Sequence, residues 1–593
     1  MLKRFFLNTL SSFVGTWVAI MLFGVVALLV GIGLVARFGA SGNSTGISRH
    51  SILVLDLNGM IEERESSVVP DYTMLLNGGI ERPQTLDVIT RALRNASANK
   101  NIDALYIKCG AVAAAPATLD AIRDEVVKFK KSGKKVYAYG DNLHSGAYYV
   151  ASAADSVFIN PYGSISMQGL SSTSLYMKGL FDKIGISWQV VKVGTFKSAV
   201  EPYIMDKMSE PAKAQLDTLF GNMWGYMKKQ ICADRKKLTP ARIDSLIDVV
   251  NISWAPVEEV VKSGMVDKAV YERTMDDRFA ALVGKKKKDD LKFVSPRDLL
   301  ADDAFSQIGG KNRIAVLYAC GEIVDGAPTG INFERLVPVI TNLAEDDDVK
   351  GLVLRVNSPG GSAFGSDQIG EALDYFKSKG KKLAVSMGDY AASGGYWISC
   401  GANRIFADPL TITGSIGIFG LIPNGEVLLE KIGVNPQFAG TNPQADFPTL
   451  YRPMTDEQLA VVQKNVEDGY NRFINRVAKG RGMSVDKVRA IAEGRVWDAI
   501  KAKQIGLVDE LGGLEKAIEW TAKETGISDK YSLSVYPEIK PSFWDMVVDG
   551  TSFEKAAAEL MNPGLSEFTI AYLRRYLTMQ RVQARMPDFK VGF

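Results

Sequence analysis

Two glycine-rich loops and one lysine-containing loop hold the residues best suited to chemistry in this sequence. NSPGGS (357–362) and DYAASGGYW (389–397) each follow an apolar run, and GTFKSAVEPY (194–203) lies far upstream. A Gly-Gly pair lets backbone N–H groups approach a ligand without interference from Cβ atoms, as the binding of a developing oxyanion requires. Ser393 precedes an apolar helical stretch, whose first amides favour a negative charge nearby. Ser393 is therefore the candidate nucleophile.

A serine hydroxyl needs a base to become nucleophilic near neutral pH, and the chain has few histidines to offer. There are two, His50 and His144. His50 lies near the apolar segment at the N-terminus. His144 is the immediate neighbour of Ser145, and the side chains of such a pair are expected to point in different directions. A histidine base is disfavoured.

Lysine is the other known base for a serine nucleophile, and Lys197 in GTFKSAVEPY is the candidate. An ordinary lysine has a pKa of about 10.4 and is neutral in about one molecule in 2,500 at pH 7, so its pKa would have to fall by about 3. Burial has to supply that fall. Phe196, Ala199, Val200 and Pro202 are apolar neighbours, which favours a loop folded against protein. The alternative is a solvated loop lysine.

The elements that position these loops belong to an internal repeat. Five segments recur in the same order with an offset of about 250 residues, which chance similarity does not explain. The pairs are KNIDALYIK (100–108) with DVKGLVLR (348–355), residues 131–152 with 377–399, GSISMQGL (163–170) with GSIGIFGL (414–421), FDKIGI (181–186) with LEKIGV (429–434), and SGMVD (263–267) with IGLVD (505–509).

The two copies differ where chemistry is expected. The second copy has NSPGGS where the first has GAVAAAPAT (110–118), and DYAASGGYW where the first has DNLHSGAYY (141–149). Conversely, the first copy has Lys197 where the second has GTNPQADFPTLY (440–451). We therefore predict that the second copy supplies the nucleophile and the oxyanion loops, and that the first copy supplies the base.

Each copy alternates short β-rich runs with helical stretches, the pattern of an α/β domain with largely buried strands. GLVLRV (351–356) and KKLAVSM (381–387) are examples of the runs, and SDQIGEALDYFKSKG (366–380) is a helical stretch. A capping box from Thr455 to Gln458 predicts the start of a long helix that runs toward Lys479.

The repeat and the composition together predict six segments. These are a cytoplasmic N-terminus (1–12), a transmembrane helix (13–36), the first copy (49–295), a linker (296–311), the second copy (312–540) and a C-terminal helical extension (541–593). The extension carries Arg574, Arg575, Arg581 and Arg585 among apolar residues at helical spacing. That pattern fits a helix packed on the body or on another subunit, with binding to a membrane surface as the alternative.

The transmembrane prediction rests on 24 uncharged residues from Phe13 to Ala36. About 20 are enough to span a hydrocarbon core. Lys3 and Arg4 precede them, so the positive-inside bias puts the N-terminus in the cytoplasm and the remainder outside. The alternative is a cleaved secretory signal, whose apolar region is normally about 7–15 residues long. A retained anchor is favoured.

The composition limits the kinds of partner and cofactor that we expect for this chain. The chain of 593 residues has 70 basic and 67 acidic residues, a net charge of +3 and 46% hydrophobic residues, and nothing indicates a nucleic-acid partner. The four cysteines show neither close pairing nor metal-ligand spacing and are expected to be core thiols. They are Cys109, Cys232, Cys320 and Cys400. No metal or other cofactor is expected.

Together, NSPGGS, MGDYAASGGYWIS (387–399), TITGSIGIFG (411–420) and TFKSAVEPY (195–203) resemble the signal peptide peptidase A family of serine proteases, in its long, duplicated type, also called protease IV. The resemblance runs from the apolar segment to about residue 515. It implies two tandem Clp protease/crotonase-like α/β domains of β-β-α units after a transmembrane helix. It also implies a homotetramer on the periplasmic side of the bacterial inner membrane, which degrades signal peptides and other apolar, extended peptides.

Carried over residue by residue, the resemblance implies a dyad of Ser393 as nucleophile and Lys197 as general base. Gly361 and Gly394 would supply the oxyanion amides, and Ser415 would hydrogen-bond Lys197. The sequence leaves open whether Lys197 meets Ser393 within one chain or across a subunit boundary. Two other functions share some of these features: an acyl-CoA-processing enzyme, which uses similar paired oxyanion amides, and a membrane scaffold without catalysis.

Overall fold

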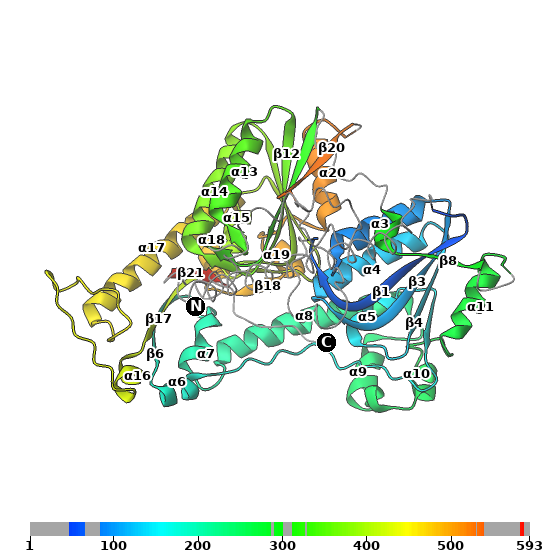
Figure 1. Cartoon of the computed structure of the whole chain (residues 1–593), viewed down its shortest axis with the longest axis horizontal. Coiled ribbons are helices and arrows are strands. Elements are labelled where there is room, and N and C mark those ends of the chain that lie inside the picture. The colour runs from blue at the N-terminus through cyan, green and yellow to red at the C-terminus, as the bar shows by residue number, and fades with distance from the viewer. Residues whose placement is uncertain are drawn as a thin grey trace, which may run out of the picture. The chain divides into compact units, whose positions relative to one another are not determined.

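Each copy of the repeat folds around its own parallel sheet (Figure 1). The computed structural model describes residues 47–65, 83–285, 290–300, 311–326, 329–528, 530–538 and 582–585, all of which belong to one unit. The predicted transmembrane helix at 13–36 lies outside these residues. Within the described part of the chain, no helix is both long enough and apolar enough to cross a membrane.

In the first sheet, β1, β3, β4, β5 and β7 follow one another, and β2 and β8 both pair with β1. Every pairing is parallel. The strands are β1 (Ser51–Glu62), β2 (Gln84–Thr85), β3 (Ile102–Ala113), β4 (Lys135–Gly140), β5 (Ser156–Ile159), β7 (Lys268–Ala269) and β8 (Lys292–Val294).

The second copy repeats this arrangement. The order β20-β9-β12-β14-β15-β19 matches β8-β1-β3-β4-β5-β7, again with parallel pairing, while β16 and β18 extend the sheet from the end of β14. The strands are β9 (Arg313–Cys320), β12 (Val349–Ser358), β14 (Lys382–Ala392), β15 (Arg404–Ala407), β16 (Ile412–Gly414), β18 (Val496–Asp498), β19 (Glu510–Leu511) and β20 (Ser532–Tyr536). The tandem duplication read from the sequence is therefore also a duplication of strand order.

Parallel strands covered on both faces explain the nearly continuous apolar runs. Alternate residues of β9 face opposite cores: Ala315 and Leu317 join the larger core of the second copy, whereas Ile314 and Val316 pack with α20 (Leu514–Glu524). In the first copy, α11 (Arg273–Leu282) covers the corresponding face.

The other helices lie around the two parallel sheets and beside the strands of a third sheet described below. They are α3 (Leu86–Ala98), α4 (Pro116–Lys130), α5 (Ser145–Ala151), α6 (Lys178–Ile184), α7 (Glu201–Ile204), α8 (Glu210–Asp234), α9 (Pro240–Asp248), α10 (Val257–Ser263), α12 (Pro296–Leu299), α13 (Phe333–Glu345), α14 (Ala363–Ser378), α15 (Gly394–Ser399), α16 (Glu426–Lys431), α17 (Asp456–Arg481), α18 (Val485–Ile491) and α19 (Ala499–Gln504).

A third sheet joins the two copies. Its order is β11-β10-β13-β21-β17-β6. The first copy contributes β6 (Ser187–Val193), which runs antiparallel to β17 (Ile418–Asn424) of the second copy along seven residue pairs. The remaining strands are β10 (Ile323–Val324), β11 (Ile331–Asn332), β13 (Gly360–Ser362) and β21 (Val582–Arg585).

Several local predictions are confirmed. Both β-rich runs of the second copy lie in β12 and β14, and the capping box at Thr455 and Gln458 starts α17. The prediction of core thiols is confirmed for Cys109 and Cys400, which are buried, whereas Cys232 and Cys320 are half-buried; all four are free.

The helical prediction for the C-terminal extension is wrong at residues 582–585, which form the strand β21. There the open edges of β13 and β17 offer hydrogen bonds on both sides, and these outweigh the helical spacing of the arginines. The other residues of 541–593 lie outside the described part of the chain.

Candidate active site

The pairing of β6 with β17 brings the lysine loop of the first copy to the second copy. Val193 at the end of β6 lies opposite Ile418 at the start of β17. Because the strands are antiparallel, the residues after β6 and the residues before β17 meet at the same end of the pair. Those residues include Lys197 and Ser415, so the two side chains converge within one chain.

The Lys197 amine lies against two serines. Its Nζ is 2.8 Å from Ser393 Oγ, 3.0 Å from Ser415 Oγ and 3.1 Å from the Ser415 carbonyl oxygen. The side chains of all three residues are 0% exposed. Burial lowers the pKa of Lys197 well below its usual value, because the charged form loses its hydration.

This contact set matches a neutral amine. A neutral lysine has two N–H donors and one lone pair, whereas an ammonium has three donors and no acceptor. The two oxygens of Ser415 can accept the two N–H groups, which leaves the lone pair for the hydroxyl proton of Ser393. The geometry therefore suits a lysine that takes a proton from a serine.

Ser393 occupies a sharp turn between β14 and α15. It is the N-cap residue of α15, with φ +56° and ψ −117°, and its amide donates to the Gly414 carbonyl at 2.8 Å. A positive φ at a residue other than glycine costs about 1–3 kcal/mol and persists where the surrounding structure imposes it. Such strain is common in active sites, and here the turn places Ser393 Oγ 2.8 Å from Lys197 Nζ.

The first copy has a serine at the corresponding position, but in a different setting. Ser145 is the first residue of α5 and is not among the residues with positive φ. Its hydroxyl donates to the Ser166 carbonyl oxygen. In the first copy the Ser145 hydroxyl is therefore engaged by the backbone, in a structural role.

The candidate oxyanion glycines lie on two loops in close backbone contact. Gly361 belongs to β13, with φ +149°, and a Cβ atom there would lie 2.0 Å from the Ile323 carbonyl oxygen. Gly394 is the first residue of α15, and a Cβ at the next residue, Gly395, would lie 2.7 Å from the Ser358 carbonyl oxygen. Both loops therefore require glycine for their close approach.

A loop that the sequence did not single out holds the lysine in place. The Glu493 carbonyl accepts from the Phe196 amide at 2.9 Å, and the Arg495 carbonyl accepts from the Ser415 amide at 2.7 Å. A Cβ at Gly494 would lie 2.7 Å from Lys197 Cβ. The only signal in the sequence is a glycine after a helix, which marks a turn but does not identify its partners.

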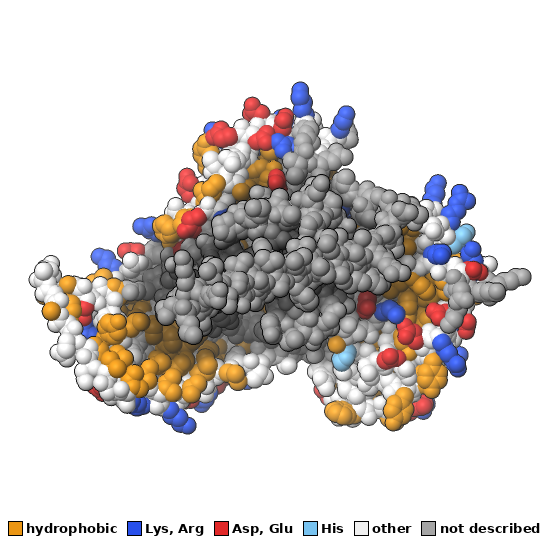
Figure 2. Space-filling model, viewed as in Figure 1, with side chains coloured by type: hydrophobic (Ala, Val, Ile, Leu, Met, Phe, Trp, Pro, Cys, Tyr) orange, Lys and Arg blue, Asp and Glu red, His pale blue; other side chains and the backbone are white. Residues whose placement is uncertain are grey.

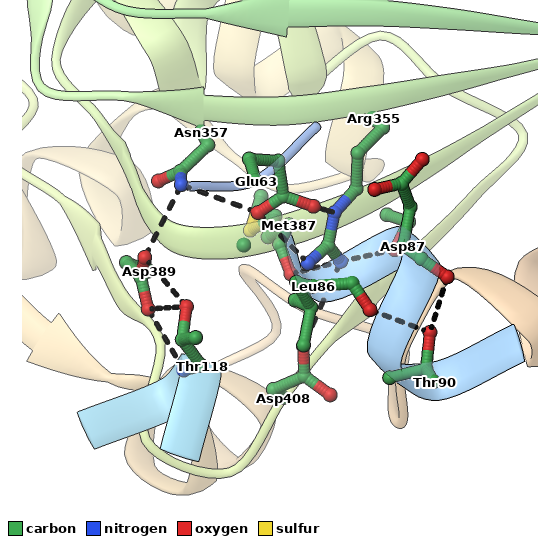
Figure 3. A network of polar contacts seen from close by, with 12 residues as sticks. Glu63, Leu86, Asp87, Thr90, Thr118, Arg355, Asn357, Met387, Asp389 and Asp408 are labelled. Atoms are coloured by element: carbon green, nitrogen blue, oxygen red, sulfur yellow. Dashed lines mark hydrogen bonds and ion pairs between the residues drawn. The ribbon is translucent and has the colours of Figure 1, made fainter. Parts of the chain in front are cut away.

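A buried polar network ties both reactive loops to the first copy (Figure 3). Asp389, four residues before Ser393, accepts from the amide and the hydroxyl of Thr118, both at 2.9 Å. Asn357, at the start of NSPGGS, donates to Asp389 and to Glu63, both at 3.2 Å. Thr118 and Glu63 belong to the first copy, so both loops are held at the boundary between the copies.

Arg355 provides the positive charge of this network. Its guanidinium lies 2.7 Å from a Glu63 oxygen and 3.6 Å from Asp408. Burial raises the pKa of Asp408 to about 7, and Arg355 opposes that rise. All three line a cleft of about 460 Å³, which is not lined by Lys197, Ser393 or the other candidate site residues. The cleft is thus separate from the serine–lysine pair.

Comparison with known proteins shows the family to which the chain belongs. The family model described as "Peptidase family S49" matches residues 128–284 and 375–528, which together cover more than half of the chain. The chain therefore belongs to peptidase family S49 and is a serine-type protease with two tandem copies of the family domain.

Relatives of similar length align with most of the chain. "Protease 4" of Haemophilus influenzae is 35% identical over 513 residues, which cover 84% of this chain and 82% of the relative. "Protease 4" of Salmonella typhi is 33% identical over 542 residues, with 89% and 86% covered. "Serine protease SPPA, chloroplastic" of Arabidopsis thaliana is 26% identical over 505 residues, with 84% and 72% covered.

Proposed function

We propose that this chain is a membrane-anchored endopeptidase with a Ser–Lys dyad, which degrades cleaved signal peptides and other apolar, extended peptides. The observation that carries the proposal is the 2.8 Å distance between Lys197 Nζ and Ser393 Oγ in a site from which water is excluded. Within the described part of the chain no carboxylate pairs with Lys197, and a buried lysine without such a partner is a base suited to neutral pH.

In this mechanism neutral Lys197 takes the proton of Ser393 as Oγ attacks the peptide carbonyl carbon. The amides of Gly361 and Gly394 donate to the oxyanion, and Ser415 keeps the amine in position. Lys197 then gives its proton to the leaving amine, which leaves an ester on Ser393. Water, with Lys197 again as base, hydrolyses the ester and restores the serine.

The substrate proposal rests on the resemblance of the four loops to signal peptide peptidases and on the strands beside the dyad. The strands β13 and β17 carry or adjoin the oxyanion glycine and Ser415, and strand edges bind peptides in extended form. The same resemblance supports Clp protease/crotonase-like domains, anchored by residues 13–36 in the bacterial inner membrane with the catalytic copies on the periplasmic side.

We also propose a homotetramer in which copies of the chain associate head to tail. In the first copy, β6 pairs with the second copy, but the corresponding residues 435–441 of the second copy form no strand, and residues 433–445 are exposed. The same region carries exposed apolar side chains around α6 and α16, gathered on one face in Figure 2. They include Leu180, Ile184, Val427, Ile432, Val434 and Phe438. Sedimentation analysis of the detergent-solubilised chain tests this: a monomer would refute it.

The dyad is tested by fluorophosphonate labelling and by cleavage of casein and a signal peptide. We expect labelling at Ser393, with activity lost in Ser393→Ala and lowered about 10²–10⁴-fold in Lys197→Ala, the usual contribution of a general base. Ser145→Ala is the matched control, because Ser145 is the equivalent serine of the first copy, and it should keep both activity and labelling. Substantial cleavage by either dyad variant would refute the mechanism.

The two rival functions give different results in the same assays. A scaffold without catalysis would show no labelling of Ser393 in folded protein. An acyl-CoA-processing enzyme would hydrolyse an acyl-CoA thioester faster than any peptide. Membrane anchoring is checked separately, because deletion of residues 13–36 should release the chain from the membrane fraction.

A further inference from the structure

The cleft of about 460 Å³ that Arg355 and Asp408 line lies between the two copies, and we call it the boundary cleft. Apolar and aromatic side chains from both copies also line it: Leu86 and Tyr226 come from the first copy, and Tyr318 and Ile518 come from the second. Small-molecule sites typically have volumes of about 300–1,000 Å³ and combine such side chains with a few polar groups. The boundary cleft is therefore suited in size and lining to a small organic molecule.

Asp408 offers such a molecule a buried carboxylate. The residue is 6% exposed, and its side chain lines the boundary cleft. It lies 3.6 Å from the Arg355 guanidinium, which is beyond hydrogen-bond distance, and no side chain or amide of the described residues donates a hydrogen bond to it. A buried carboxylate without donors is costly. Its oxygens are thus available to the N–H groups of a ligand.

The first copy does not have a carboxylate at this position. Asp408 directly follows β15, as Asn160 directly follows β5, and the two strands have corresponding neighbours in their sheets. The Asn160 amide donates to Asp141 at 2.7 Å. The fold therefore accepts a neutral side chain at this point, and only the second copy has an acid there that lines a cleft.

Positive charge is in short supply around Asp408. Burial raises its pKa, and three neighbouring carboxylates raise it further against the opposing charge of Arg355. These carboxylates belong to Asp120, Glu63 and Asp389. Arg355 is itself 2.7 Å from Glu63, as Figure 3 shows, so its charge is shared. Buried charges are normally paired, and a cation in the boundary cleft would supply the missing partner.

Asp120 places a second carboxylate in the cleft, from the first copy. It belongs to α4, lines the boundary cleft and is buried. The hydroxyls of Tyr149 and Tyr226 donate to it at 2.5 and 3.2 Å, and burial nevertheless raises its pKa to about 6. A cation between Asp120 and Asp408 would therefore interact favourably with both copies at once.

We infer that the boundary cleft binds a small organic cation, whose ammonium or guanidinium head donates hydrogen bonds to Asp408 and whose short apolar or aromatic body packs against the side chains that line the cleft. An organic cation is favoured over a metal ion because the described ranges of the chain contain no group of three His, Cys, Asp or Glu side chains arranged to hold one. The site is separate from the dyad, and its ligand joins the first copy to the second.

Calorimetric titration of the full-length protein with 2-phenylethylamine, compared with 2-phenylethanol, tests the inference. The two compounds share the same body and differ in the charged head. At about pH 8, where Asp408 is ionised, we expect the amine to bind with a Kd of about 1 mM or tighter and the alcohol to bind at least about tenfold more weakly. Equal binding of the two compounds, or no binding of the amine, would overturn the inference.

Two variants that each remove one carboxylate form a matched pair. Asp408→Asn reproduces the residue type of the first copy and should weaken binding of the amine about 10- to 100-fold, the usual effect of a lost hydrogen bond to a charged group. Glu519→Gln removes an exposed carboxylate that lines the same cleft and should change the affinity less than about threefold. Equal losses in both variants would show a general effect of charge and would refute Asp408 as the partner. The comparison of the amine with the alcohol in wild-type protein decides the question even if Asp408→Asn does not fold.

The Ser393→Ala variant separates this site from the dyad. Because neither Ser393 nor Lys197 lines the boundary cleft, Ser393→Ala should bind 2-phenylethylamine as tightly as wild type. Loss of binding in this variant would place the amine at the dyad and overturn the inference.

Discussion

Substitution of Ser415 by alanine is the most informative change at the dyad, because it removes a single contact. The Ser415 hydroxyl lies 3.0 Å from Lys197 Nζ, and the Ser415 carbonyl, which the substitution keeps, lies 3.1 Å from it. The amine then has one fixed acceptor instead of two and spends part of its time turned away from Ser393. The substrate does not contact Ser415 in the proposed mechanism, so kcat should fall and KM should stay the same.

The expected size of the effect follows from one hydrogen bond. A typical intramolecular hydrogen bond contributes about 0.5–1.5 kcal/mol, which corresponds to a fall in kcat of about 2- to 13-fold. The hydroxyl also accepts from the ammonium form, so its loss lowers the pKa of Lys197 further. The acid limb of the pH–rate profile should therefore move to lower pH.

A fluorogenic peptide assay across pH measures both effects, and Ser415→Gly is the control. Ser415 has a φ of +49°, which glycine tolerates better than alanine, so any difference between the two variants reports backbone strain. A shift of the acid limb to higher pH would refute the reasoning. So would an unchanged kcat, or a loss as large as that of Lys197→Ala.

Three further predictions concern the base, the boundary between the copies and the oxyanion loop. In the proposed mechanism activity needs the neutral form of Lys197, whose pKa burial lowers, so kcat/KM should rise as pH rises through that pKa; a profile without an acid limb would contradict this. Thr118→Val removes the hydroxyl that donates to Asp389 at 2.9 and 3.0 Å. It should lower the free energy of unfolding by about 1–3 kcal/mol, measured by denaturant titration, and an unchanged free energy of unfolding would contradict this prediction. Gly361→Ala places a Cβ atom 2.0 Å from the Ile323 carbonyl oxygen. It should lower kcat/KM at least about 100-fold in protein that circular dichroism shows to be folded. Near-normal activity would exclude Gly361 from the oxyanion site.

The sequence was most informative where the two copies had diverged. Comparison of the repeats identified the Ser393 loop, the Gly361 loop and Lys197, because glycine pairs and a lone lysine with apolar neighbours have direct chemical meanings. The α/β fold followed from the strand and helix patterns, and the strand order of the two sheets confirms the duplication.

What the sequence could not reveal are partners brought together by the fold. Thr118 and Asp389 are 271 residues apart, and Glu63 and Arg355 are 292 apart. Gly494 has meaning only because Lys197 passes against it. At 582–585 the local pattern favoured a helix, but the open edges of β13 and β17 decide the conformation. Long-range contacts of this kind leave no local periodicity to detect.

The antiparallel pairing of β6 with β17 also has a consequence for biosynthesis. A growing polypeptide emerges from its N-terminus, so Lys197 is made long before Ser393, and the Glu493–Arg495 loop that holds both strands' ends follows later still. Because Lys197 and Ser393 meet only when this contact forms, their pairing cannot assemble on a chain that is still being synthesised. The order of the two copies along the chain thus delays the pairing of Lys197 with Ser393 until the second copy has been synthesised.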